Sequence, residues 1–170
     1  MEQFSNEINA IRQRAKQELL ENTSNTYILY SEIPHFSSEF SVSIKKNDTE
    51  ALEITTKWWD KHDDIQKYHQ LGLLNLDRLR ILEKTRILTV VEKNLLQNIL
   101  EELDLVELPN SIENKEVIVL DGCEYELILN TKNIQKIYNW RIANHNYVVI
   151  EKIIRFLVEN SNLQKFQEMK

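Results

Sequence analysis

The chain has 170 residues, enough for one globular domain with its own core, and a formal net charge of −6. Its basic residues are scattered, which argues against a nucleic-acid surface, because phosphate binding needs clustered lysine and arginine. Two glycines and one cysteine exclude glycine-rich phosphate loops, nucleophile elbows and multi-cysteine zinc sites. We therefore expect no catalytic residues, no metal and no cofactor.

The start of the chain carries charges throughout and lacks the apolar segment of a secretory signal. No run of about 18 apolar residues could cross a membrane, and a single cysteine is typical of a reducing compartment. These features predict a cytoplasmic protein with no membrane contact. Residues 1–170 are expected to form a single domain, in which residues 1–24 provide an N-terminal helix that is able to dock separately.

The first predicted element is a helix over residues 3–21, whose apolar residues recur at steps of three and four and form a narrow seam. These residues are Phe4, Ile8, Ile11, Ala15 and Leu19. A short strand over residues 27–30 follows. Alternating patterns over residues 40–45 and 52–59 then predict an antiparallel hairpin with one solvent-facing side, turned at Asn47-Asp48.

Residues 60–77 are the least regular part, and two alternatives stay open there: a short helix from Asp63 to Gln70 or a long loop. Apolar residues among charges favour another strand over residues 78–88. The sequence Thr89-Val90-Val91-Glu92 matches a capping box. It predicts a helix over residues 89–103 that packs broadly against the sheet.

The last third of the chain predicts a three-stranded meander followed by a helix over residues 147–159. Its strands are residues 117–120, 123–130 and 134–140, and Asp121-Gly122 is a strong hairpin-turn signal between the first two. The predicted fold class is α+β, a mostly antiparallel sheet with three main helices. The N-terminal and C-terminal helices flank the strands, one face of the sheet is covered by helices, and the other is partly exposed.

Three groups of residues could carry chemistry, and each has a simpler interpretation. Asp60, Asp63 and Asp64 lie near His62 and His69, but the two histidines are seven residues apart, and a solvated acidic loop is favoured over a metal site. Cys123 could act as a nucleophile with His145. It lies on an apolar strand face, however, where cysteine is usually an inert small hydrophobe.

Glu124 and Glu126 lie on the same face of one predicted strand. Paired carboxylates suggest glycosidase chemistry. Alternating charges are also what any solvent-facing strand shows, and this second interpretation is favoured.

The adjacent pair Trp58-Trp59 points to a binding surface. Neighbouring residues on a strand face opposite sides, so only one of the two tryptophans can belong to the core. An exposed Trp59 beside acidic residues suits a protein–protein hot spot, where tryptophan is enriched; the alternative is that the following segment covers it. The predicted partner-binding residues are Trp59, Asp60, Asp63 and Asp64.

One part of the chain carries a family resemblance. The pattern Val119-Leu120-Asp121-Gly122, then Tyr125-Glu126-Leu127, then Tyr138-x-Trp140, with an apolar helix after it, resembles the C-terminal meander of small uncharacterised bacterial proteins. Some of these resemble immunity proteins, which neutralise a cognate toxin by binding it. The resemblance implies no shared catalytic residues.

The sequence thus predicts a non-enzymatic, cytoplasmic protein-binding domain, of which an immunity protein is one specific form. The expected partner is a protein, not a nucleic acid or a membrane, and the oligomeric state is left open. Two alternatives remain: a small-ligand-binding domain or enzyme of unrecognised type, which needs a pocket with convergent polar groups, and a structural subunit of a larger assembly.

Overall fold

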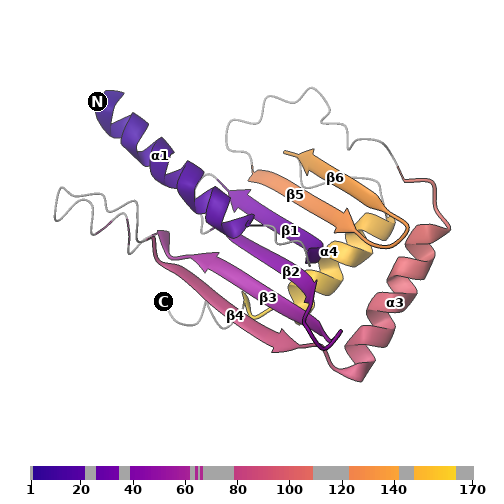
Figure 1. Ribbon diagram of the computed structural model, residues 1–170. Coiled ribbons are helices and arrows are strands. Elements are labelled where there is room, and N and C mark those ends of the chain that lie inside the picture. The colour runs from indigo at the N-terminus through magenta and orange to yellow at the C-terminus, as the bar shows by residue number, and fades with distance from the viewer. Residues whose placement is uncertain are drawn as a thin grey trace.

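The protein has an α+β fold in which helices lie on both sides of one antiparallel sheet (Figure 1). The computed structural model describes residues 2–21, 26–34, 39–61, 64, 66, 79–108, 123–141 and 148–163. Within these ranges, three helices and six strands confirm the predicted fold class.

The described elements follow the predicted order with small shifts at their ends. They are α1 (Glu2–Leu19), β1 (Thr26–Pro34), β2 (Phe40–Lys46), β3 (Leu52–Trp59), β4 (Ile81–Ile87), α3 (Val90–Asp104), β5 (Cys123–Asn130), β6 (Gln135–Trp140) and α4 (Val148–Asn160). Lys61, Asp64 and Gln66 are also helical, and the other residues from Asp63 to Gln70, on which the two alternatives depend, lie outside the described residues. The strand order is β4-β3-β2-β1-β5-β6, so the β5–β6 hairpin adds to the free edge of β1.

Two hydrophobic clusters lie on opposite faces of the sheet. The larger one joins the sheet to α4 and α3 and includes Ile28, Ile44, Leu127 and Ile153. The smaller one joins α1 to the β3–β4 side through Ile11, Ala15, Leu19 and Trp59. In Figure 1, α1 crosses in front of the sheet, α4 lies behind it, and α3 stands at one end.

The structure corrects two expectations about what covers the sheet. The β2–β3 hairpin has no open solvent-facing side, because Ser41, Thr55 and Trp59 on the side toward α1 are all buried. The helix α3 packs mainly against α4, rather than broadly against the sheet. As a result, Val91 and Leu95 are exposed.

The predicted three-stranded meander is confirmed only for its last two strands, β5 and β6, which pair antiparallel. Residues 117–120 and the turn at Asp121-Gly122 lie outside the described residues. However, β5 is hydrogen-bonded to β1 along one edge and to β6 along the other. Because a strand has only two edges, a third strand of a meander has no place beside β5.

The predicted capping box at the start of α3 is confirmed. The Glu92 amide donates to Thr89 Oγ1 at 3.3 Å, and the Thr89 amide donates to Glu92 Oε2 at 2.7 Å. The Arg86 guanidinium also donates to both carboxylate oxygens of Glu92, at 2.9 and 2.6 Å. The Arg86 bonds, with help from Thr89, lower the pKa of Glu92 to about 2. The start of α3 is therefore fixed to the end of β4.

Replacing Thr89 with alanine is expected to lower the free energy of unfolding by about 1 kcal/mol, because the Glu92 amide loses its acceptor. Urea unfolding followed by circular dichroism measures the change. Asn94→Ala is the matched control, since Asn94 is exposed in the same helix, and its effect should stay within about 0.5 kcal/mol. Equal effects of the two substitutions would contradict the role given to the cap.

Candidate functional site

The predicted exposure of Trp59 is wrong. The side chain is only 1% exposed and packs against Ile11, Ala15 and Leu19 of α1. The Lys61 ammonium lies 5.8 Å from the centre of the indole ring. The narrow apolar seam of α1 needs an apolar surface to bury it, and Trp59 provides that surface. This tryptophan is therefore not available as an exposed anchor for a partner.

The acidic residues around Trp59 do not form the expected open surface either. Asp64 Oδ2 accepts hydrogen bonds from Trp59 Nε1 and from the Arg80 backbone amide, both at 2.8 Å. Asp60 lies 3.6 Å from the Arg80 guanidinium. Asp63, like both histidines of the segment, lies outside the described residues. The two described carboxylates thus hold this corner of the fold together.

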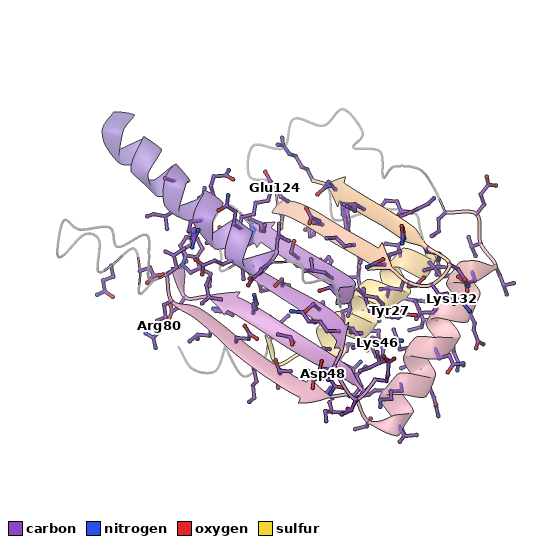
Figure 2. All side chains as sticks on the ribbon, viewed as in Figure 1. Tyr27, Lys46, Asp48, Arg80, Glu124 and Lys132 are labelled. Carbon is purple, nitrogen blue, oxygen red and sulfur yellow. The ribbon has the colours of Figure 1, made fainter. Side chains whose placement is uncertain are left out.

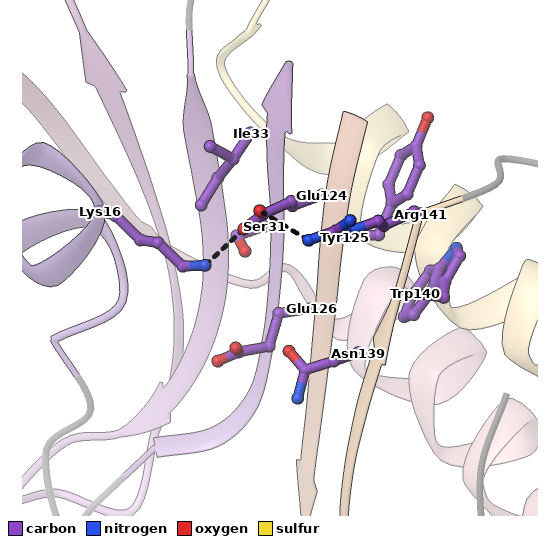
Figure 3. Close-up of a pocket in the computed structure, with 9 residues that line it drawn as sticks. All are labelled: Lys16, Ser31, Ile33, Glu124, Tyr125, Glu126, Asn139, Trp140 and Arg141. Carbon is purple, nitrogen blue, oxygen red and sulfur yellow. Dashed lines mark hydrogen bonds and ion pairs between the residues drawn. The ribbon is translucent and has the colours of Figure 1, made fainter. Parts of the chain in front are cut away.

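The structure instead assembles a charged cleft between α1 and the strands β1, β5 and β6 (Figure 3). It consists of two adjoining pockets of about 210 and 140 Å³, which share Lys16, Ile33 and Glu124. Its charged residues are Arg12, Lys16, Glu39, Glu124, Glu126 and Arg141, and Ser31 and Asn139 add polar groups. Of these residues, only Glu124 and Glu126 were considered as candidate site residues from the sequence.

Strand register brings the polar side chains of the cleft together. Ser31 is the direct neighbour of Glu126 across β1 and β5, and Glu126 is the direct neighbour of Asn139 across β5 and β6. Side chains directly opposite each other share a face, with Cβ atoms about 5 Å apart. The residues that alternate with them, such as Leu127 and Tyr138, belong to the large core cluster. A polar row therefore crosses three strands on the side of the sheet that faces α1.

Two cations already neutralise Glu124. The Lys16 ammonium donates to Glu124 at 2.6 Å, and the Arg141 guanidinium lies 3.8 Å from its other oxygen. Figure 3 shows Lys16 extending from α1 to meet Glu124, with Glu126 beside Asn139. Glu126 makes no hydrogen bond or ion pair with any described residue. Partial burial raises its pKa. The interpretation of these glutamates as an open solvated face is therefore wrong, because both are half-buried.

Two further polar atoms of the cleft are buried without a hydrogen-bond partner in the described part of the chain. They are Ser31 Oγ and Glu39 Oε2, and the two residues are 0% and 1% exposed. The Lys61 ammonium is 3.9 Å from the other oxygen of Glu39. Burial raises the pKa of Glu39 to about 7. Unsatisfied buried polar atoms are rare, and they often mark a place where water or a ligand binds.

A second candidate surface lies at the opposite end of the sheet, on the outer side of α3. We call it the α3 patch; it consists of Ile87, Val90, Val91 and Leu95. Val90 and Val91 are 74% and 76% exposed. Of the nine large apolar side chains that are exposed in the described part, six belong to residues 87–106. In Figure 2, Asp48 and Lys132 lie beside α3, whereas Glu124, which belongs to the charged cleft, lies far from it.

The remaining candidates offer little chemistry. Burial raises the pKa of the Cys123 thiol to about 11, so the reactive thiolate is scarce at neutral pH. Its suggested partner, His145, lies outside the described residues. No group of three or more metal-ligating side chains occurs in the described ranges. Among the helices of those ranges, none is both long and apolar enough to span a membrane.

The chain matches no protein-family model, no curated protein and no solved structure. The resemblance to toxin-immunity-like proteins therefore stays a prediction. Two surfaces are therefore candidates for binding a partner or ligand: the charged cleft and the α3 patch.

Proposed function

We propose that the protein is a non-enzymatic, cytoplasmic protein-binding domain that captures a basic partner through the α3 patch. The observation that carries this proposal is the exposure of the four large apolar side chains of the α3 patch, at the end of β4 and in the first half of α3. Soluble proteins normally scatter such side chains singly, whereas a contiguous exposed group marks an interaction surface.

The local structure makes the α3 patch a firm surface. Val91 and Leu95 are four residues apart in the helix, so their side chains lie next to each other on one face. The capping box and the Arg86–Glu92 pair fix the first turn of the helix, which carries Val90 and Val91. A rigid apolar surface loses little conformational entropy when a partner binds, which favours affinity.

The charge around the α3 patch favours a basic partner. Residues 90–108 contain five acidic side chains and one lysine. Two of the five are ion-paired, Glu92 with Arg86 and Glu102 with Lys152. The other three are exposed beyond the patch: Glu101, Asp104 and Glu107. Complementary charge steers a partner toward the surface and excludes acidic competitors. An immunity protein, which the C-terminal resemblance suggests, would meet a toxin in this way.

The double substitution V91Q/L95Q is expected to weaken partner binding about tenfold or more, because it removes apolar anchors from the centre of the interface. The tagged full chain is used to capture a partner from its native lysate. The affinity of the purified partner for each variant is then measured by surface plasmon resonance. The association rate should also fall as the salt concentration is raised, because salt screens the attraction between the basic partner and the acidic side chains beyond the patch.

Ile137→Gln is the matched control. Ile137 is a large apolar residue, 62% exposed, but it lies in β6 rather than in the α3 patch. We expect this variant to bind the partner as the unchanged protein does. If Ile137→Gln weakened partner binding and V91Q/L95Q did not, the α3 patch would not be the binding surface.

A further inference from the structure

We propose that the charged cleft is a second binding site, independent of the α3 patch, and that it takes the ammonium group of a small primary alkyl amine. Three acceptor side chains carry this inference. They lie side by side on β1, β5 and β6: Ser31, Glu126 and Asn139.

Within the described residues, Glu126 differs from Glu124 in having no ion-pair partner, although Lys16 acts on it electrostatically from a longer distance. Glu124 has both Lys16 and Arg141 within ion-pair distance. Its neighbour Glu126 has no cation within such a distance among the described residues. A half-buried carboxylate without a partner is costly, since burial removes water that it does not replace with another donor. A positively charged ligand would supply the missing donor.

The cleft also contains the buried hydroxyl of Ser31. This residue is 0% exposed, it lines the larger pocket, and its Oγ has no hydrogen-bond partner in the described part of the chain. Serine, glutamate and the amide oxygen of asparagine all accept hydrogen bonds. An ammonium group has three N–H donors and no acceptor, so its hydrogen-bonding capacity matches the row of Ser31, Glu126 and Asn139.

The size of the pocket and its apolar wall indicate how large the amine is. Adjacent strands are about 4.8 Å apart, so Ser31 and Asn139 flank Glu126 closely enough for their side chains to converge on one nitrogen atom. The pocket volume of about 210 Å³ falls below the roughly 300–1,000 Å³ of sites for drug-sized ligands. Ile33 contributes an apolar wall, which suits a short alkyl chain.

The test measures binding of n-butylammonium chloride to the full chain by amide chemical-shift changes in NMR, at constant ionic strength. We expect shifts that are centred on the strands of the cleft and that saturate. The neutral analogue n-butanol and the anion butyrate should each bind about tenfold more weakly or not at all, because butanol brings no positive charge and only one donor to Glu126, and the carboxylate of butyrate is repelled by it. Butanol or butyrate binding as well as butylammonium would overturn the proposal.

Two variants separate recognition from folding. Glu126→Gln should weaken butylammonium binding about tenfold, whereas the control Glu159→Gln, at an exposed position of α4, should not change it. Ser31→Ala should also weaken binding. It should leave the stability unchanged or slightly higher, since it removes a buried hydroxyl that has no partner. Unchanged affinity in both cleft variants would overturn the proposal, and neither variant touches the α3 patch.

Discussion

Replacement of Trp59 with alanine is expected to lower the free energy of unfolding by about 3–5 kcal/mol, the usual cost of deleting a buried tryptophan. The side chain is 1% exposed and forms the largest member of the small cluster under α1. Its loss leaves a cavity that the backbone of β3, paired on both sides, cannot close. Urea unfolding followed by circular dichroism measures the change.

The same substitution should release α1 before the rest of the protein unfolds. Without Trp59, α1 keeps only the partly buried Leu79 and Ile81 as apolar neighbours in the described part. Its polar contacts remain: Ser41 Oγ donates to the Leu19 carbonyl at 2.7 Å, and the Lys57 ammonium donates to the Glu18 carbonyl at 3.0 Å. These bonds satisfy the last carbonyls of the helix, but each contributes only about 1 kcal/mol. Hydrogen exchange should therefore show α1 amides losing protection while those of β1 and β5 keep it.

Trp59→Phe is the control for this experiment. Phenylalanine retains most of the apolar surface but loses the hydrogen bond from the indole Nε1 to Asp64. We expect a smaller loss of about 1–2 kcal/mol, with α1 still protected. If Trp59→Ala costs no more than Trp59→Phe and leaves α1 protected, Trp59 does not anchor the helix.

Local patterns predicted most of the elements of this fold. The alternation around Val42 and Ile44 identified β2, and the apolar face around Ile153 identified α4. The capping box at Thr89 fixed the start of α3 within one residue. Each of these signals lies within one element, where the period of the side chains alone decides the structure.

Pairings between distant segments could not be predicted. The period of β3 says that Trp58 and Trp59 face opposite sides, but it does not say what covers the second side. The covering surface, at Ile11, Ala15 and Leu19, was visible in the sequence as a separate seam. For β5, the local turn signal at Asp121-Gly122 suggested a hairpin partner, whereas pairing with the distant β1 prevails.

The charged cleft shows the same limit. Lys16, Ser31 and Glu126 come from three elements that are far apart in the sequence, and only the strand register makes them neighbours. The sequence of β5 did indicate that the two glutamates share one face, because Glu124 and Glu126 alternate with the half-buried Tyr125 and the buried Leu127. The pattern could not show that α1 and β1 enclose the glutamate side as well, so it indicated open solvent.

The stability of the protein is expected to fall by about 3 kcal/mol as the pH rises from about 5 to about 8, because of Glu39. Burial raises the pKa of Glu39 from 4.5 in an exposed chain to about 7 in the fold. Between these values the folded protein holds a proton that the unfolded chain has released. Stability is therefore greatest below the unfolded pKa and is lost as the pH rises through the folded pKa.

Glu39→Gln isolates this contribution, because glutamine keeps the shape and the hydrogen-bonding capacity of the protonated carboxyl group without its charge. The charged groups that act on Glu39 are Lys61, Arg12, Glu124 and Lys16, and all of them remain in the variant. Urea unfolding across the pH range should show the unchanged protein losing stability relative to Glu39→Gln from about pH 5 upward, with the difference levelling off once the pH passes the folded pKa of about 7. Parallel pH profiles would mean that Glu39 stays ionised in the fold. Its buried charge would then have to be balanced by the surrounding cations, among which the Lys61 ammonium lies 3.9 Å away.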